Sequence, residues 1–303
     1  MSDYENKKNI LQDMKIVRIS GGLGNQMFQF ALYEALRRQH PEEEMLVDLH
    51  GFIGYKKHRG FELPKVFHVA YEEATLGEIA KVAYPYPNYQ SWRILSRVLP
   101  CRKTMLKEKP DFSLEPEALT RPGDTYYDGY WQHEEYFDRI SGDIVRLYHF
   151  PDFENDKNQL VGKMALETNS CAIHIRRGDY LTDPLRQGTT SLDFPLRAIK
   201  WMKENKAPEQ WLVFSDDMPL ARECLKAVLP EERTCYVDWN QGIRSINDMH
   251  LMSLCKNHII ANSTFSWWGA WLCQREDETV VAPHEWMNRK NVVSPAVKDW
   301  IKL

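Results

Sequence analysis

The second half of the chain alternates short apolar runs with longer amphipathic stretches. The apolar runs predict strands, and the stretches between them, with apolar residues at helical spacing, predict helices. Strands are expected at 171–175, 211–214, 235–237, 258–261 and 280–282, and helices at 192–205, 220–228, 245–256 and 265–274. Strands that alternate with helices of this length are typical of βαβ units, which build a parallel sheet. A ligand site is therefore expected beyond the carboxyl ends of these strands.

The first half begins in the same way and then becomes irregular. A β-branched run at 15–19 and a glycine turn at 20–24 precede apolar positions at helical spacing, and a second strand is expected at 45–47. Seven prolines interrupt residues 51–135. We expect loops, short helices and insertions there, because proline breaks long elements.

The polar segment 150–158 indicates a linker. A length of 303 residues also suits about two domains of ~150 residues each. The sequence therefore predicts two α/β domains, 1–155 and 156–303, with a C-terminal segment that can pack back on the first domain.

Net charge and composition narrow the class of protein. Hydrophobic residues at 43% and charged residues at 27% are ordinary for a globular protein. A formal charge of −4 argues against a general surface for nucleic acid or for an anionic membrane, although a local basic pocket is compatible with it.

Membrane and redox signals are absent from the sequence. It has no apolar run of about 18 residues, and its first 30 residues contain no signal-peptide pattern. We expect a cytoplasmic protein without an integral membrane segment, for which peripheral membrane association stays open. Six cysteines without CxxC or Cys/His zinc spacing predict reduced, mostly buried thiols.

The first motif is the glycine turn that opens the predicted first helix. Gly22 and Gly24 permit a close backbone approach, and the amides of Asn25 and Gln26 follow them. A dinucleotide fingerprint needs a third glycine where this chain has Met27, so a nicotinamide or flavin site is disfavoured. The turn either brings N–H groups to a ligand at a helix start or is a plain tight turn.

The second motif, residues 174–179, ends the strand 171–175. Alternation sends His174 and Arg176 to one side of the strand. Two adjacent arginines at the end of a buried strand need partners. Asp179 can match Arg177, which leaves Arg176 for an anion, and a guanidinium suits phosphate oxygens.

The third motif follows the strand 211–214 and consists of Ser215, Asp216 and Asp217. Two acids at a strand end could hold a divalent metal, as in metal-dependent nucleotide-sugar enzymes. Those enzymes usually have D-x-D spacing, whereas the acids here are adjacent and point to opposite sides of the chain. A carboxylate that accepts hydrogen bonds from a base or ribose fits as well. For Asp217, the cap of a helix that starts near Pro219 is the alternative.

The fourth motif follows the strand 258–261 and opens an apolar helix. Its hydroxyls and the N–H groups of the helix start suit a diphosphate. The tryptophans that follow favour core packing over a sugar platform. The motif residues are Asn262, Ser263, Thr264, Phe265 and Ser266, and the tryptophans are Trp267, Trp268 and Trp271.

Together the four motifs resemble the α-1,2-fucosyltransferase family. The matching pieces are GGLGNQMFQFA (21–31), HIRRGDY (174–180), FSDD (214–217) and NSTFSWWGAWL (262–272). The resemblance implies a GT-B-like fold with two Rossmann-like domains facing a central cleft. It implies GDP-L-fucose as donor in the C-terminal domain and a galactoside acceptor in the N-terminal domain. It also implies inverting transfer to the 2-hydroxyl of galactose, no metal cofactor and a bacterial type of enzyme.

The resemblance also suggests roles for individual residues. Without a metal, preorganised donors must meet the charge that develops on the departing phosphate. We expect Arg176 to be the principal hydrogen-bond donor to this phosphate, with Asn25 and His174 as further catalytic residues. The predicted donor-binding residues are Gly22, Gly24, His174, Arg176, Asp179, Ser215, Asp216, Asn262, Ser263, Thr264, Phe265 and Ser266.

Three points stay open in the sequence. The acceptor proton goes either to an unidentified acidic group or to the departing phosphate. The alternatives to the main function are another GDP-sugar, another acceptor hydroxyl, or a non-catalytic binding protein. On the acceptor side, candidates are the aromatic residues Tyr84, Tyr86, Trp92, Tyr130 and Trp131.

Overall fold

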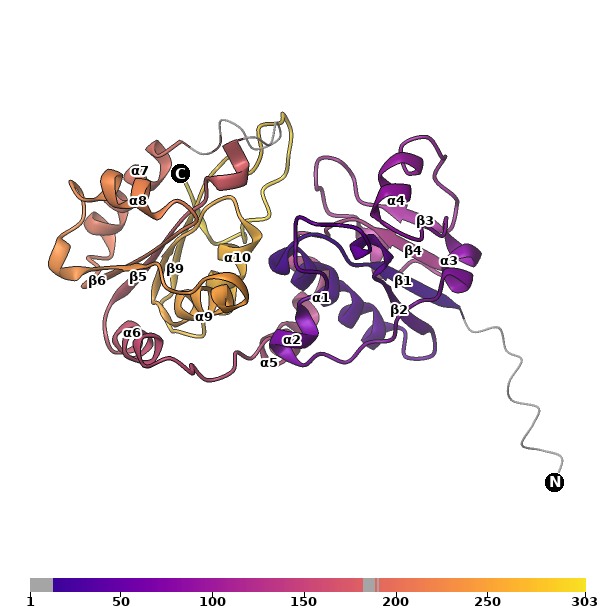
Figure 1. The fold of residues 1–303 in the computed structure, drawn as a ribbon, viewed down its shortest axis with the longest axis horizontal. Helices are drawn as coiled ribbons and strands as arrows, with labels where there is room; N and C mark the ends of the chain where they lie inside the picture. The colour runs from indigo at the N-terminus through magenta and orange to yellow at the C-terminus, as the bar shows by residue number, and fades with distance from the viewer. Residues whose placement is uncertain (1–12, 182–188, 190) are drawn as a thin grey trace, which may run out of the picture. The chain divides into compact units, whose positions relative to one another are not determined.

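The computed structural model describes residues 13–181, 189 and 191–303, with the exception of the Asp179 side chain. The chain divides between Leu147 and Tyr148 into two compact units, here called unit 1 and unit 2 (Figure 1). Each unit is built on a parallel sheet with helices packed against it. The expected α/β class is therefore confirmed.

Unit 1 contains a four-stranded parallel sheet in the order β2-β1-β4-β3. Its strands are β1 (Met14–Arg18), β2 (Glu44–Asp48), β3 (Met105–Lys107) and β4 (Thr125–Asp128). Its α-helices are α1 (Leu23–Gln39), α2 (Leu63–Phe67), α3 (Leu76–Val82), α4 (Tyr89–Leu95) and α5 (Ser141–Leu147). Short 3-10 helices lie at His50–Phe52, Pro116–Ala118, Glu134–Tyr136 and Asp138–Ile140.

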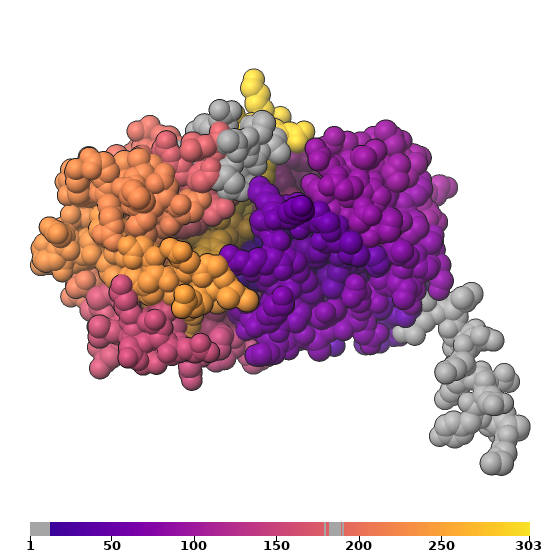
Figure 2. Space-filling model, viewed as in Figure 1, coloured from indigo at the N-terminus to yellow at the C-terminus, as the bar shows by residue number. Residues whose placement is uncertain are grey.

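The expectation of loops, short helices and insertions for residues 51–135 was incomplete, because the stretch also contains strands. Two of the four strands of the sheet, the inner strand β4 and the edge strand β3, come from this stretch. They span three and four residues, which is too short for an alternating pattern to be read from the sequence. In Figure 2 the stretch after β2, purple to magenta on the bar, forms much of the visible surface of unit 1.

Unit 2 contains a six-stranded parallel sheet in the order β10-β9-β8-β5-β6-β7. Its strands are β5 (Ser170–Ile175), β6 (Gln210–Ser215), β7 (Thr234–Val237), β8 (Asn257–Ile259), β9 (Thr279–Ala282) and β10 (Ile301–Lys302). Its α-helices are α6 (Asp156–Glu167), α7 (Asp193–Asn205), α8 (Met218–Leu225), α9 (Ile246–Leu254) and α10 (Thr264–Trp271). Short 3-10 helices lie at Gly178–Leu181, Glu231–Arg233 and Gly242–Ser245.

Helices cover both faces of the unit 2 sheet, because both faces of its strands are apolar. Ile173 and Val213 pack with α7 and α8, whereas their neighbours Ala172 and Leu212 pack with α6 and α9. This alternation places two hydrophobic layers on one sheet.

The segment 150–158 is only in part a connection. Helix α6 begins at Asp156, and the side chain of Asn155 caps it by accepting hydrogen bonds from the amides of Lys157 (2.8 Å) and Asn158 (3.3 Å). The sequence analysis also missed β10, which follows the strand predicted as the last one.

The six cysteines form no disulfide, and Cys171, Cys255 and Cys273 are buried while Cys101 is exposed. Among the described residues, no helix combines the length and the apolarity needed to cross a membrane.

Candidate functional site

The strand order of unit 2 reverses at β5. From β5 the chain continues to β6 and β7 on one side, and then to β8, β9 and β10 on the other. The carboxyl ends of β8, β5 and β6 are neighbours, since Ile173 pairs with Ile259 and Ile175 pairs with Ser215. Three of the four sequence motifs follow these strand ends. Ligands of open parallel sheets bind at such a switch point.

The Asp216 carboxylate joins two of the motifs. Its Oδ1 accepts a hydrogen bond from the Arg177 amide at 2.8 Å, and its Oδ2 lies 3.2 Å from Nη1 of Arg176. A Cβ on Gly178 would lie 2.5 Å from the same Oδ2, so a larger residue there would have to displace the Asp216 carboxylate. Arg176 was predicted to be left for an anion, but it has an acidic partner in Asp216. Asp216 orients its guanidinium, whose remaining exposure is about a third of the side chain, 34%.

His174 is buried at the end of β5, with 7% of its surface exposed. Burial, with a contribution from the Arg176 charge, lowers the pKa of its imidazole to about 3, so the ring is neutral at physiological pH. Its Nδ1 has no hydrogen-bond partner among the described residues, and its ring lies 6.0 Å from that of Phe265. A buried polar atom without a protein partner requires an explanation, and a bound ligand that forms a hydrogen bond with Nδ1 is one.

Ser215 and Asp217 have local partners. The Asp217 carboxylate accepts a hydrogen bond from the Leu220 amide at 3.3 Å and caps α8, whose first turn contains Pro219. The Ser215 hydroxyl accepts one from the Asp217 amide at 3.0 Å. The cap interpretation of Asp217 is therefore confirmed.

The polar residues before α10 also bond to one another. Ser263 caps the helix by accepting from the Phe265 amide at 3.3 Å, and the Ser266 hydroxyl donates to the Ser263 carbonyl at 3.3 Å. The Asn262 amide donates to the Trp286 carbonyl at 3.1 Å and to the Thr189 hydroxyl at 2.6 Å. Thr264 begins the helix and is half-buried.

The expected packing of two tryptophans is confirmed. Trp267 and Trp268 are fully buried, and their rings lie 4.9 Å apart. The Asp179 side chain lies outside the described part of the chain, so its predicted pairing with Arg177 stays a prediction.

Gly22, Gly24 and Asn25 lie at the start of α1, in unit 1. Gly22 is the N-cap residue, and a Cβ there would lie 3.2 Å from Cε1 of His58. Gly24 is buried, and Asn25 Oδ1 accepts a hydrogen bond from Gln132 Nε2 at 3.0 Å.

The Gln26 amide does not approach a ligand, contrary to expectation. It is fully buried and donates to the carbonyls of Gly21 and Gly60, both at 2.9 Å. It also accepts from the Glu62 amide at 2.8 Å. Gln26 therefore ties a loop of unit 1 to α1.

A cavity of about 290 Å³ lies at the carboxyl ends of β1, β3 and β4. Tyr55, Tyr89 and Trp92 form an aromatic wall, with ring centroids 4.5 Å apart for the first pair and 5.7 Å for the second. The Arg18 guanidinium lies 3.9 Å from the Trp92 ring and donates to Asp128 Oδ1 at 2.7 Å. Aromatic faces with polar groups beside them are suited to a sugar ring.

Glu108 lines the same cavity and organises its wall. Its two carboxylate oxygens accept from the amides of Tyr130 (2.8 Å) and Trp131 (2.7 Å). Trp131 has a φ of +56°, and a Cβ on Gly129 would lie 2.4 Å from Glu108 Cβ. Burial raises the pKa of Glu108 to about 7 in spite of these donors. Sequence reasoning missed this residue because the strand before it was not recognised.

Groups with metal-ligand chemistry lie elsewhere among the described residues. The two sets that come close together are His258, Cys273 and Glu278, and His40, Glu42 and Glu43. In the first set, His258 Nδ1 lies 3.1 Å from Glu278 Oε1, and burial raises the pKa of the Cys273 thiol to about 12. A protonated thiol is a poor metal ligand.

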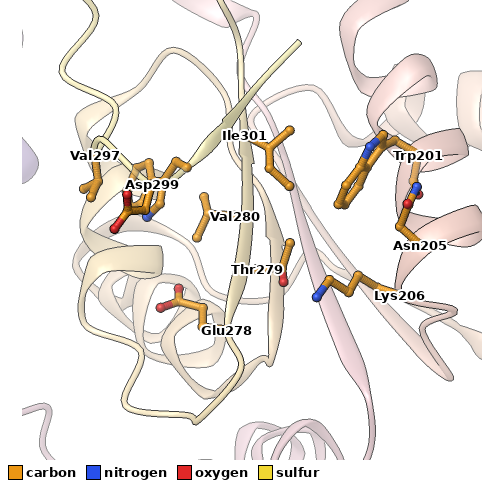
Figure 3. A pocket seen from close by; sticks show the side chains of 10 residues that line it. Trp201, Asn205, Lys206, Glu278, Thr279, Val280, Val297, Asp299 and Ile301 are labelled. Carbon is orange, nitrogen blue, oxygen red and sulfur yellow. The ribbon is translucent and has the colours of Figure 1, made fainter.

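A further cavity of unit 2, of about 540 Å³, lies at the amino end of β9. Figure 3 shows Trp201, Asn205 and Lys206 at the end of α7 on one side, and Glu278 and Thr279 opposite. No residue of the four motifs lines it, so we assign it no part in the chemistry.

Known proteins resemble this chain over nearly its full length. Residues 110–303 match the model of glycosyl transferase family 11. The chain belongs to glycosyl transferase family 11. This family 11 protein is 32% identical to the O-antigen biosynthesis glycosyltransferase WbnK of Escherichia coli, with 94% of this chain and 99% of that protein covered. It is 30% identical to an alpha-1,2-colitosyltransferase of Escherichia coli, with 95% and 98% covered.

Solved structures extend the comparison to the fold. The fucosyltransferase NodZ from Bradyrhizobium superposes with a TM-score of 0.52 at 14% identity, over 86% of this chain and 92% of that one. A crystal of NodZ alpha-1,6-fucosyltransferase soaked with GDP-fucose gives a TM-score of 0.51, also at 14% identity and over 86% and 92% of the two chains. The family 11 protein is thus a glycosyltransferase with a GT-B-like fold, as expected.

Proposed function

We propose that this protein transfers L-fucose from GDP-β-L-fucose to the 2-hydroxyl of a terminal β-galactose in an oligosaccharide or glycan. The transfer inverts the anomeric configuration, needs no metal and takes place in the cytoplasm. Two relatives support parts of this proposal: NodZ was soaked with GDP-fucose, and the Escherichia coli colitosyltransferase is named for an alpha-1,2 transfer.

The observation that carries the proposal is the pair of Arg176 and Asp216 beside His174 at the switch point of unit 2. Cleavage of the fucosyl–phosphate bond leaves negative charge on the β-phosphate. A guanidinium already oriented by a carboxylate meets that charge without reorganisation, which is the main source of electrostatic catalysis. The neutral His174 adds a hydrogen-bonding nitrogen without a competing positive charge.

The aromatic cavity of unit 1 is the acceptor site in this proposal. The Arg18–Asp128 pair and the aromatic wall offer polar groups and flat faces to a hexose. The hydroxyl that attacks fucose must lose a proton, and we assign that proton to Glu108. Its pKa of about 7 is close to the value at which a general base works best near neutral pH.

The test is incubation with labelled GDP-fucose and a panel of galactosides, with NMR of the product linkage. The expected product is an α-1,2-fucosylated galactoside, formed at the same rate with EDTA. GDP-mannose and nucleotide-linked colitose serve as competing donors. A faster reaction with either competitor, another linkage, or activity that EDTA abolishes and manganese restores would reject the corresponding part of the proposal.

A further inference from the structure

The stretch between Glu78 and Glu108 in unit 1 contains no acidic residue. Its six cations are Lys81, Arg93, Arg97, Arg102, Lys103 and Lys107. The whole chain has a formal net charge of −4, so the residues outside this stretch have a net charge of −10. The stretch is therefore a segment of net positive charge in an otherwise acidic chain. This segment lies outside the residues 110–303 that match the family model.

Large apolar side chains on the same segment face solvent. Ile94 is 63% exposed, Leu95 is 41% exposed and Val98 is 71% exposed. Helix α4 contains no buried residue, and Asn88 and Ser91 fix its start in a capping box. Its other face, with Tyr89 and Trp92, lines the aromatic cavity. Helix α4 therefore presents a cavity wall on one side and exposed apolar residues on the other.

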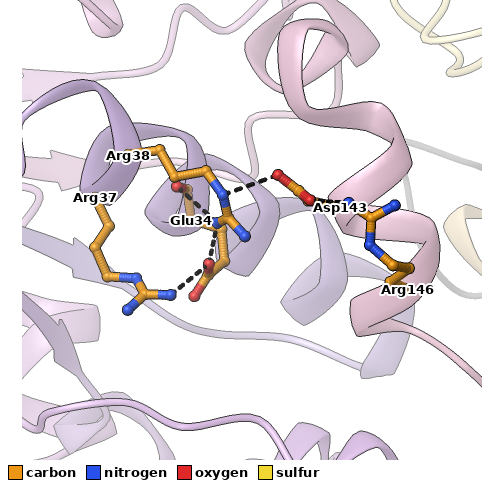
Figure 4. A network of polar contacts seen from close by, with 5 residues as sticks. All are labelled: Glu34, Arg37, Arg38, Asp143 and Arg146. Atoms are coloured by element: carbon orange, nitrogen blue, oxygen red, sulfur yellow. Dashed lines mark hydrogen bonds and ion pairs between the residues drawn. The ribbon is translucent and has the colours of Figure 1, made fainter.

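The cations next to these apolar residues are available. Arg93 and Arg97 are exposed, and neither forms an ion pair with any described residue. The arginines of α1 differ, because Glu34 and Asp143 neutralise Arg38 in the network of Figure 4. Arg102 instead donates to the carbonyls of Ala80 (2.9 Å) and Lys81 (3.0 Å), so it anchors the segment to α3.

We infer that residues 93–103 bind the surface of a membrane that contains anionic lipid. Exposed apolar side chains next to cations are typical of segments that bind at a membrane interface. In such segments the apolar side chains enter the headgroup region, and the cations attract lipid phosphate. Three exposed apolar side chains, two on helix α4 and one just after it, are few for a stable protein interface, which buries about 800 Å² on each partner. The inference rests on the proposed function, since a cavity beside the membrane would receive a lipid-linked acceptor.

Vesicle co-sedimentation of the full chain tests the inference. Binding is expected with phosphatidylglycerol in phosphatidylcholine vesicles, absent with phosphatidylcholine alone, and weaker at high salt. The double variant Arg93→Gln/Arg97→Gln should weaken binding by about 25-fold, at roughly fivefold for each lysine or arginine near the surface. Ile94→Ser/Val98→Ser should weaken it by about tenfold or more. Arg222→Gln and Leu160→Ser are the matched controls, because both residues are exposed in unit 2.

Two readouts separate this inference from the proposed function. All four variants should retain wild-type transfer to a water-soluble galactoside, which tests the function without a membrane. Absence of binding, equal binding to neutral vesicles, or equal binding of the variants would overturn the inference while transfer stays intact. Self-association in analytical ultracentrifugation that the Ile94 and Val98 substitutions abolish, without vesicle binding, would assign the surface to a second copy and also overturn it. Vesicle binding without any transfer would reject the function, and with it the lipid-linked acceptor, but would still show that residues 93–103 bind anionic lipid.

Discussion

Acidification should destabilise unit 2 through His174, and the size of this effect follows from its burial. The imidazole has a pKa of about 3 in the folded protein against 6.5 in a free chain. Below pH 6.5 the imidazole of His174 therefore binds a proton in the unfolded chain but not in the folded protein. Stability that is fully present at neutral pH is lost as the pH falls toward 3.

The free energy of unfolding should fall by about 1.4 kcal/mol for each pH unit in this window. At pH 5 the stability lost through His174, relative to neutral pH, is about 2 kcal/mol, because the unfolded imidazole is almost fully protonated there. Other groups overlap with it. The pKa of His250 is lowered to about 4 by burial and acts in the same direction. The pKa values of Glu108 and Asp248 are raised to about 7 by burial and act in the opposite direction.

A variant isolates the contribution of His174 from this background. His174→Asn removes the titrating group. The free energy of unfolding of this variant should therefore fall less steeply between pH 6.5 and pH 4 than that of the wild type, by about 1.4 kcal/mol for each pH unit. Urea unfolding followed by tryptophan fluorescence at a series of pH values measures the difference. His284→Asn, at an exposed position, is the matched control for the replacement of a histidine by asparagine. Parallel curves for His174→Asn and wild type would refute the reasoning, whatever their vertical offset.

Three further predictions concern transfer to a soluble galactoside. Arg176→Ala should lower kcat/KM by about 10²–10³-fold, as loss of an oxyanion donor does, and near-normal turnover would remove it from the mechanism. Arg222→Ala, which breaks an exposed pair with Asp238, should have no effect. Activity should fall as the pH drops below about 7, where Glu108 takes up a proton, and a pH-independent rate there would instead assign the acceptor proton to the departing phosphate. Gly178→Ala should lower kcat because the added Cβ would displace the Asp216 carboxylate. The control Gly142→Ala, whose Cβ would have no neighbour closer than 3.8 Å, should leave kcat unchanged. Equal rates for the two variants would show that the position of the Asp216 carboxylate is unimportant.

The sequence predicted the unit 2 sheet because its strands are buried on both faces and its helices carry a regular apolar spacing. Each of the strands β5 to β9 overlaps a predicted range. β3 and β4 could not be found in this way, since strands of three and four residues hold too few positions to show a period. Glu108 and the aromatic cavity were missed together with them.

Side-chain partners were harder to predict than strand ends. Asp216 was expected near the nucleotide, but its pairing with Arg176 depends on strand register, which brings residue 216 next to residue 176 across a separation of 40 positions. Gln26 stands in a motif for which ligand binding was one interpretation, yet its side chain bonds to a loop that the sequence left irregular. Such contacts come from tertiary structure, and local pattern does not encode them.

The two units repeat one arrangement with different exposure, and the difference bears on function. In each unit an arginine at the end of one strand pairs with an aspartate at the end of a neighbouring strand. Arg18 and Asp128 are 2.7 Å apart, with 8% and 14% of their side chains exposed. Arg176 and Asp216 are 3.2 Å apart, with 34% and 22% exposed. Separating a buried pair leaves an uncompensated charge, which costs about 3–5 kcal/mol, whereas water reaches a partly exposed pair and lowers that cost. Arg18 therefore stays with Asp128 as a fixed wall of the aromatic cavity, whereas Arg176, held by Asp216 and about a third exposed, keeps part of its guanidinium accessible to a phosphate.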